Sequence, residues 1–263
     1  MTMFAGFLDD AAVFPPGNAT VRDAVPAHRS YHSAWYQDLV GPFVFPVARL
    51  GELVHGGHDL DGVVLSVTTP AASLPEALAA PVPLAAVEVV PDGDVAELIA
   101  RLDVSLPESV IGYIEVPRGE QRDHALDAIA GTRYRAKFRT GGTVPHAHPG
   151  ERELAQSLRA AVTRNVPFKC TAGLHHAVRH TDGDLEQHGF LNVLRATHAL
   201  QQGASADEAA AILADREPPP GLARDVVAAA RTSFVCFGTC SVIEPVADLV
   251  ALELINVDGL RPG

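Results

Sequence analysis

Short apolar segments alternate with amphipathic segments along almost the whole chain. Eight of the apolar segments are rich in β-branched and aromatic residues and show little strict polar alternation, which is typical of parallel strands covered by helices. These segments span residues 4–13, 42–50, 62–68, 83–91, 110–117, 134–141, 166–173 and 233–241.

The segments between these strands carry apolar residues at helical spacing. Residues 189–203 predict one helix, and Ser205 with Glu208 has the spacing of a capping box that opens the next, which Pro218 and its proline neighbours end. Two further helices each present one buried stripe. The stripes are Val95, Leu98, Ile99 and Leu102 in the first and Leu154, Leu158 and Val162 in the second.

Eight strands that alternate with helices imply right-handed crossovers and a parallel sheet. A chain of 263 residues has the typical length of a single (β/α)8 barrel, so we expect one TIM-barrel domain over residues 1–263. An open doubly wound sheet is the second choice. No Gly-x-Gly-x-x-Gly follows the first strand, which disfavours dinucleotide binding.

Composition narrows the expected partners and location. The net charge of −12 disfavours binding to nucleic acid or to an anionic membrane surface, and no apolar run is long enough to cross a bilayer. The first residues lack the basic region of a secretory signal, and three cysteines give no disulfide framework. We therefore expect a cytoplasmic protein without nucleic-acid or membrane partners, and the sequence leaves a homodimer open.

Polar residues gather near the predicted C-terminal strand ends, where the active site of a parallel barrel lies. Apolar side chains would pack better there, so the polar ones are candidates for binding or catalysis. The residues are Asp9, Asp10, Arg49, Glu88, Glu115, Lys137, Arg139, Lys169, His175, His176, Thr239, Cys240 and Ser241.

Lysine is scarce, since only Lys137 and Lys169 occur among 20 basic residues. Unlike arginine, a lysine can lose its proton and attack a carbonyl carbon. Two ammonium groups ~4 Å apart on adjacent strands would repel by about 4 kcal/mol, which could lower one pKa by up to roughly 3 units. Arg139 on the same strand face would add to this effect. A neutral amine beside a retained cation is suited to Schiff-base formation, although the three cations could instead only bind an anionic substrate.

Glycines follow both lysine strands. Backbone N–H groups at these positions could approach an oxyanion or a phosphate, because glycine has no side chain; the glycines are Gly141, Gly142 and Gly173. Ser241 could donate a hydrogen bond from its hydroxyl to the same anion. Glu115 on strand five would neighbour Lys137, either as a general acid/base or as an ion-pair partner. Glu88 is a similar candidate.

Three segments together resemble the class I deoxyribose-phosphate aldolases (DeoC-like superfamily). The run 137–141 (KFRTG) is similar to that family's Lys-Thr-Ser-Thr-Gly motif, 169–175 (KCTAGLH) to Lys-x-x-Gly-Gly-Ile-Arg, and 237–241 (FGTCS) to Gly-Ala/Thr-Ser-Ser. The motifs occur in the family's order with about its lysine spacing. The resemblance implies a (β/α)8 barrel, a Schiff-base lysine at Lys137, a second lysine at Lys169 that lowers the pKa of the first, and a phosphate cradle at Gly142, Gly173 and Ser241.

The departures from the family indicate a divergent member. Arg139 stands where the family has Ser, His175 replaces its Arg, and Cys240 replaces one Ser. The catalytic Asp of strand four has no clear match, and Glu88 is nearby but longer. Deoxyribose phosphate is therefore not the expected substrate.

The histidines offer a different chemistry. His146, His148, His175 and His176 follow strands six and seven and could supply the ligands of a metal-dependent hydrolase or lyase. We expect instead that His175 and His176 contact substrate, and that His28 and His32 lie at the surface.

The sequence thus leaves three functional hypotheses. The preferred one is a metal- and cofactor-independent Schiff-base lyase of the aldolase type, acting on a small anionic carbonyl compound such as a sugar phosphate or keto acid. Lys137, Lys169, Glu115 and Glu88 are its candidate catalytic residues. Candidate substrate-binding residues are Arg139, Gly141, Gly142, Gly173, His175, His176, Ser241, Asp9 and Arg49. The alternatives are the metal-dependent enzyme and a non-catalytic anion-binding barrel.

Overall fold

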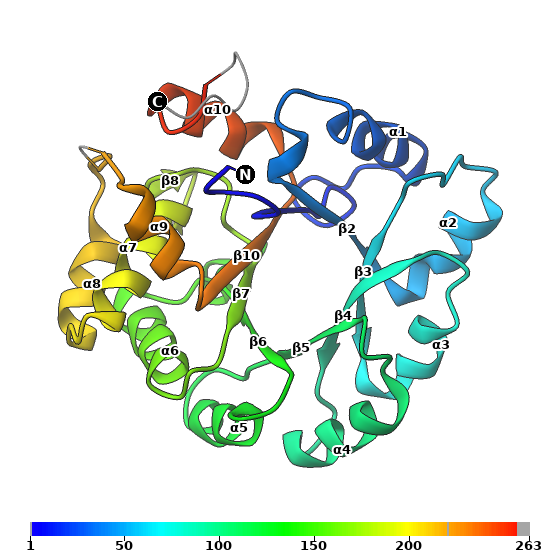
Figure 1. Ribbon diagram of the computed structural model, residues 1–263, viewed down its shortest axis with the longest axis horizontal. Helices are drawn as coiled ribbons and strands as arrows, with labels where there is room; N and C mark the ends of the chain where they lie inside the picture. Colours follow the sequence, from blue (N-terminus) through cyan, green and yellow to red (C-terminus); the bar gives the residue numbers. More distant parts are fainter. Residues whose placement is uncertain (1, 220, 257–263) are drawn as a thin grey trace.

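Eight parallel strands close into a barrel in the computed structural model, which describes residues 2–219 and 221–256 (Figure 1). Neighbours around the ring run β1, β10, β7, β6, β5, β4, β3 and β2. The barrel strands are β1 (Leu8–Asp10), β2 (Val40–Pro46), β3 (Leu65–Pro70), β4 (Leu84–Val90), β5 (Ile111–Glu115), β6 (Arg135–Arg139), β7 (Phe168–Thr171) and β10 (Phe234–Thr239). The predicted (β/α)8 barrel is therefore confirmed.

Helices follow the strands and surround the barrel (Figure 1). They are α1 (Val21–Tyr31), α2 (Leu50–His55), α3 (Leu74–Leu78), α4 (Val95–Ser105), α5 (Gln121–Ile129), α6 (Glu151–Thr163), α7 (Phe190–Gln201), α8 (Ala206–Ala214), α9 (Arg224–Ala230) and α10 (Ile243–Ala251). Short 3₁₀ turns are η1 (Gln37–Leu39), η2 (Val47–Arg49), η3 (Ala71–Ser73) and η4 (Pro145–Ala147). Within the described residues, no helix is both long and apolar enough to pass through a bilayer.

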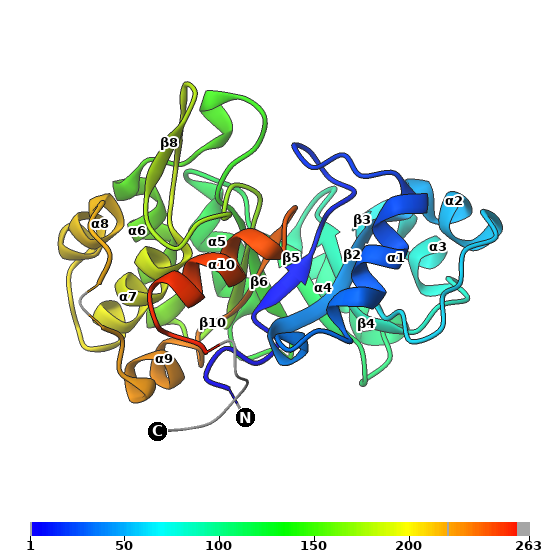
Figure 2. The same ribbon diagram turned by 90° about the horizontal axis from the view of Figure 1, so that it is seen from above.

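Two details differ from the prediction. The second strand ends at Pro46, and Arg49 lies in the turn η2. A small antiparallel hairpin, β8 (His180–Asp182) with β9 (Leu185–Gln187), follows β7 and was not predicted. Figure 2 shows the hairpin at the end of the barrel where the strands finish, and α9 at the opposite end.

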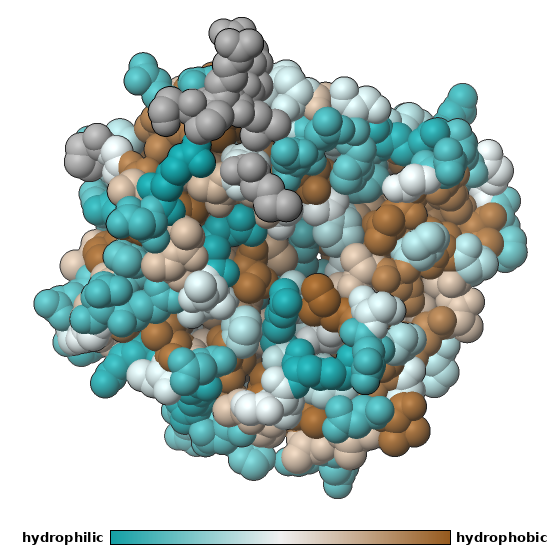
Figure 3. Space-filling model, viewed as in Figure 1, coloured by the Kyte–Doolittle hydropathy of each residue, from teal (hydrophilic) through white to brown (hydrophobic). Residues whose placement is uncertain are grey.

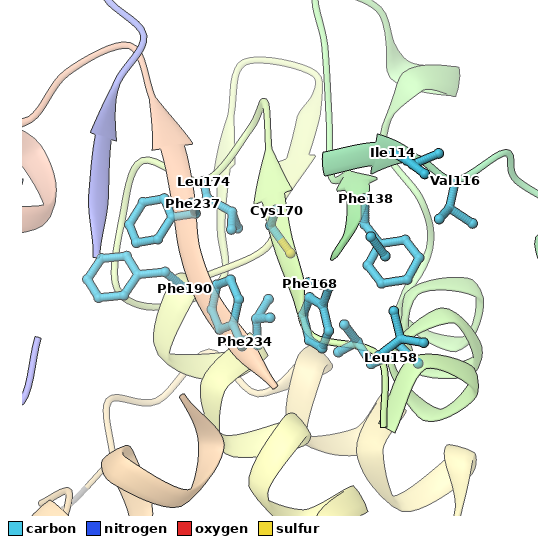
Figure 4. Close-up of a cluster of buried hydrophobic side chains, with 14 of the residues drawn as sticks. Ile114, Val116, Phe138, Leu158, Phe168, Cys170, Leu174, Phe190, Phe234 and Phe237 are labelled. Atoms are coloured by element: carbon cyan, nitrogen blue, oxygen red, sulfur yellow. The ribbon is translucent and has the colours of Figure 1, made fainter. Parts of the chain in front are cut away.

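Alternate strand residues pack outward against the helices and form the apolar shell around the barrel. Figure 4 shows part of this shell, where the Phe168 and Phe234 rings stack with centroids 5.6 Å apart and Phe190 stacks on Phe237 at 5.1 Å. Phe138 belongs to the same cluster. Because side chains alternate along a strand, its neighbour Lys137 faces the barrel interior.

Candidate functional site

The two lysines lie side by side inside the barrel. Lys137 on β6 and Lys169 on β7 are direct partners in the parallel ladder. Lys169 is fully buried and Lys137 is 4% exposed. The expected repulsion between the two amines required both lysines to lie side by side on adjacent strands, and the structure shows this placement.

Glu88 on β4 lies between the two amines. Its Oε1 is 2.5 Å from Lys169 Nζ, and its Oε2 is 3.0 Å from Lys137 Nζ. Ser66 on β3 donates a hydrogen bond to Oε1 at 2.8 Å. Glu88 is fully buried, so its two oxygens connect the lysines across the barrel interior rather than facing solvent.

Each lysine also has a second carboxylate. Asp9 Oδ2 on β1 accepts from Lys169 Nζ at 2.6 Å, and Cys236 Sγ donates to the same oxygen at 3.4 Å. Glu115 Oε2 at the end of β5 lies 3.3 Å from Lys137 Nζ. Three carboxylates and two amines thus form one buried polar network.

Burial and charge act in opposite directions on the pKa values of this network. Burial disfavours the charged form of Glu88, but Lys169, Lys137 and Ser66 outweigh it and hold the Glu88 pKa at about 2. Burial likewise opposes the Lys169 ammonium, yet Asp9 and Glu88 raise its pKa well above the usual value. For Asp9, burial dominates over the attraction of Lys169, so the Asp9 pKa is raised.

The position of Glu88 changes the electrostatic interaction that the sequence predicted between the two lysines. Direct repulsion between the two ammonium groups was expected, but Glu88 lies between them and its charge opposes that repulsion. The raised pKa of Lys169 reflects the attraction of Asp9 and Glu88, which outweighs burial and stabilises its ammonium form.

Two of the three glycines predicted to cradle an anion, Gly141 and Gly173, lie against each other. A Cβ built on Gly141 would lie 3.0 Å from Gly173 Cα, and Gly173 has φ +77°, a conformation that side chains rarely adopt. His148 Nε2 lies 2.9 Å from Gly142 O and so covers this turn. Ser241 Oγ accepts from Glu244 N near the start of α10 at 3.4 Å, a local helix contact.

Arg139 lies at the exposed end of β6, and its guanidinium makes no ion pair among the residues that the structure describes. Arg49, by contrast, is paired with Glu52 at 2.9 Å and donates to Val13 O at 3.4 Å. Arg49 was predicted on strand two; it instead lies in η2, because the strand ends three residues earlier. Among the described residues, Arg139 thus differs from Arg49 in having no carboxylate within ion-pair distance of its guanidinium.

The four histidines of the metal hypothesis are engaged separately. His175 Nδ1 lies 3.3 Å from Glu244 Oε2 and 3.5 Å from Cys240 Sγ, and His176 Nδ1 lies 3.1 Å from Asp248 Oδ2. His146 lies in η4, where its carbonyl accepts from Arg118, and His148 covers Gly142. Within residues 2–219 and 221–256, no three His, Cys, Asp or Glu side chains are grouped so that they could hold a metal ion.

One prediction for the histidines was wrong. His28 was expected at the surface, but it is buried in α1 and its Nδ1 lies 3.0 Å from Asp10 Oδ2. The apolar residues Val21, Ala24 and Val25 share the buried face of this helix. Their helical spacing continues to position 28, and that signal could have placed His28 inside.

A cavity of about 440 Å³ opens beside Glu115, between the ends of β4 and β5 and the first turns of α4 and α5. Val90, Pro117 and Gln121 are among the residues that line it, together with His124. Glu115 thus contacts Lys137 of the buried network and also lines a cavity at the rim of the barrel.

Comparison with family models, with curated proteins and with solved structures gives no match for this chain. The assignment of function therefore depends on the buried network and on the barrel that positions it.

Proposed function

We propose that this protein is a Schiff-base-forming lyase of the class I aldolase type. It acts on a small anionic carbonyl compound, either a sugar phosphate or a keto acid, and needs neither a metal nor an organic cofactor. The observation that carries the proposal is the placement of Lys137, a buried amine between Glu88 and Glu115 and directly beside Lys169. TIM barrels commonly host enzymes with catalytic residues at strand ends, which supports the same conclusion.

Lys137 is the nucleophile in this proposal. Its ammonium group first gives a proton to Glu115, and the resulting neutral amine attacks the carbonyl carbon, so that a C–N bond forms. The carbonyl oxygen takes one proton from the attacking nitrogen and one from Glu115 and leaves as water, which produces an iminium ion. Glu115 suits the proton transfer because its carboxylate lies 3.3 Å from Lys137 Nζ and borders the open cavity.

Lys169 acts as the permanent cation. Its ammonium is fixed by Asp9 and Glu88, so a second positive charge stays beside the nucleophile throughout the reaction. In the cleavage step the electrons of the broken C–C bond pass into the iminium and give an enamine. The hydroxyl of the departing carbon loses its proton to Glu115 through water and becomes an aldehyde.

Arg139 binds the anionic group of the substrate. It extends from the same strand face as Lys137, at the exposed end of β6, and no carboxylate among the described residues neutralises it. His175 and His176 follow β7 and are placed to add contacts from the neighbouring strand. The resemblance to the deoxyribose-phosphate aldolases supports the same roles for Lys137 and Lys169.

Borohydride trapping tests the proposal. The protein is treated with borohydride in the presence of pyruvate, 2-ketobutyrate, dihydroxyacetone phosphate or glyceraldehyde 3-phosphate, and digested peptides are analysed by mass spectrometry. We expect a reduced adduct on the peptide that contains Lys137 with at least one compound. Lys137→Met, which keeps the length of the side chain but removes the amine, is expected to abolish the adduct.

Two outcomes would contradict the proposal. An adduct on Lys169 alone would reject Lys137 as the nucleophile. The absence of any adduct across the panel would reject Schiff-base chemistry, and binding of these anions without an adduct would favour a non-catalytic anion-binding barrel.

A further inference from the structure

The barrel has a second cavity at the opposite end from the proposed active site. Its volume is about 320 Å³. Its lining residues come from β2, β4, β5, β6 and β10, from the segments before β1 and β10, and from Asp9 on β1. Figure 3 shows this face of the molecule, with hydrophilic and apolar residues mixed around the centre of the ring. TIM barrels normally fill their interior with layers of side chains, so an open layer requires an explanation.

Small residues leave this layer open. Gly6 precedes β1, and Ala86 contributes only a methyl group to the barrel interior, where it packs with Tyr113 and Cys236. Empty space inside a protein lowers stability because the surrounding atoms lose contacts. A bound molecule would restore those contacts.

Two guanidinium groups line the cavity without a carboxylate partner among the described residues. Arg135, half-buried at the start of β6, donates to Tyr113 OH at 3.4 Å and lies over the same ring. Arg231 is held by the carbonyls of Met3, Ala5 and Val235. A partly desolvated charge is costly unless it is paired, and no carboxylate within residues 2–219 and 221–256 forms an ion pair with Arg135.

The lining also indicates the class of anion. Asp9 borders the inner end of the cavity, and its nearness to a dianion such as phosphate would be unfavourable. Ile111, Val235 and Pro42 give the walls an apolar character. Guanidinium groups bind planar carboxylates through two parallel hydrogen bonds.

We propose that this cavity is a binding site for a small organic monocarboxylate, separate from the proposed active site. The carboxylate lies on Arg135 and its apolar body contacts Ile111 and Val235. Pockets of this size accommodate small organic molecules. A ligand there reaches Asp9, whose carboxylate holds Lys169, so the site is in direct contact with the buried network.

Calorimetry with butyrate tests this inference independently of any activity. We expect butyrate to bind, while butyramide, which has the same shape but no charge, and inorganic phosphate bind at least tenfold more weakly. Arg135→Gln should weaken butyrate binding at least tenfold. Arg139→Gln is the matched control, because it removes a guanidinium from the other end of the same strand and should leave the Kd within twofold.

A second variant probes the cavity without removing a charge. Ala86→Leu should fill the space and also weaken butyrate binding at least tenfold, and circular dichroism confirms that each variant is folded. No binding of butyrate, binding that survives Arg135→Gln, or binding that depends on Arg139 would overturn the inference. Since Lys137→Met leaves this end of the barrel intact, butyrate should bind that variant normally even if the proposed lyase activity is rejected.

Discussion

The two lysine ammonium groups are held unequally, and this difference supports the roles proposed for them. Lys169 is fully buried with carboxylate oxygens at 2.5 and 2.6 Å, whereas the contacts of Lys137 are 3.0 and 3.3 Å and one of them is to a partly exposed carboxylate. Closer pairing stabilises the charged form more strongly. The ammonium form of Lys169 is therefore strongly stabilised, which supports its proposed role as the permanent cation.

The sequence predicted the lysine pair and named Glu88 as a candidate residue, but it did not predict that Glu88 lies between the two amines. Adjacent strands and an odd–even side-chain pattern were enough to place Lys137 beside Lys169. Glu88 reaches both amines across the barrel interior, and that contact depends on strand tilt and on register between strands that are not neighbours. Local sequence patterns carry no such information. Ser66 and Cys236 were also missed as members of the network, although each contacts a carboxylate on a neighbouring strand.

Replacing Glu115 tests its role in proton transfer. Glu115→Gln keeps the size of the side chain but removes the base beside Lys137, so the rate of reaction of any compound trapped on Lys137 should fall by roughly 10²- to 10⁴-fold. Deuterium exchange at the carbon next to the carbonyl, followed by NMR, measures this rate. Glu120→Gln changes an exposed carboxylate five residues further on and should have no effect. Unchanged exchange in Glu115→Gln would assign proton transfer to another group.

At the scale of elements, all eight barrel strands were recognised, and the errors occurred at their ends. Hydrophobic content does not distinguish a strand from the 3₁₀ turn that follows it, so β2 was extended through η2 as far as residue 50. The hairpin of β8 and β9 was missed because its strands have three residues each and Leu185 is their only apolar residue. Its position is fixed instead by ion pairs, such as that between Arg179 and Glu186 at 3.1 Å.

The capping box at the start of α8 was predicted from two residues and is present. Ser205 Oγ accepts from Glu208 N at 3.2 Å, and Glu208 Oε2 accepts from Ser205 N at 2.8 Å. Ser205→Ala removes the cap and should lower the free energy of unfolding by about 0.5–2 kcal/mol in urea titrations. Ser33→Ala, at an exposed position outside any cap, should change it by less than about 0.5 kcal/mol. Equal effects from both variants would contradict a specific capping contribution.

At the scale of the whole molecule, the barrel interior is divided between two kinds of polar layer. Near the C-terminal ends of the strands, both lysines form ion pairs with carboxylates. Near the N-terminal ends of the strands, two guanidinium groups line a cavity. A buried ion network contributes specificity at a high desolvation cost, and removing one partner leaves an unpaired charge. The stability of the fold should therefore depend on the protonation of its central carboxylate.

Glu88 provides that test through the pH dependence of unfolding. Its pKa falls from 4.5 to about 2 on folding, so its contribution to stability is complete above about pH 4.5 and is lost as the pH falls towards 2. Glu88→Gln leaves two buried ammonium groups less well compensated and should lower the free energy of unfolding by about 3–5 kcal/mol at pH 7. Urea titrations should show that the difference in free energy of unfolding between wild type and variant becomes smaller below pH 4.5. The raised pKa of Asp9 has the opposite effect on stability: its contribution to the free energy of unfolding is complete below pH 3.8 and declines as the pH rises. Because Asp9 is present in both proteins, this contribution largely cancels in the difference between wild type and variant. A difference that stays constant down to pH 2 would show that Glu88 is not held as a carboxylate by the lysines.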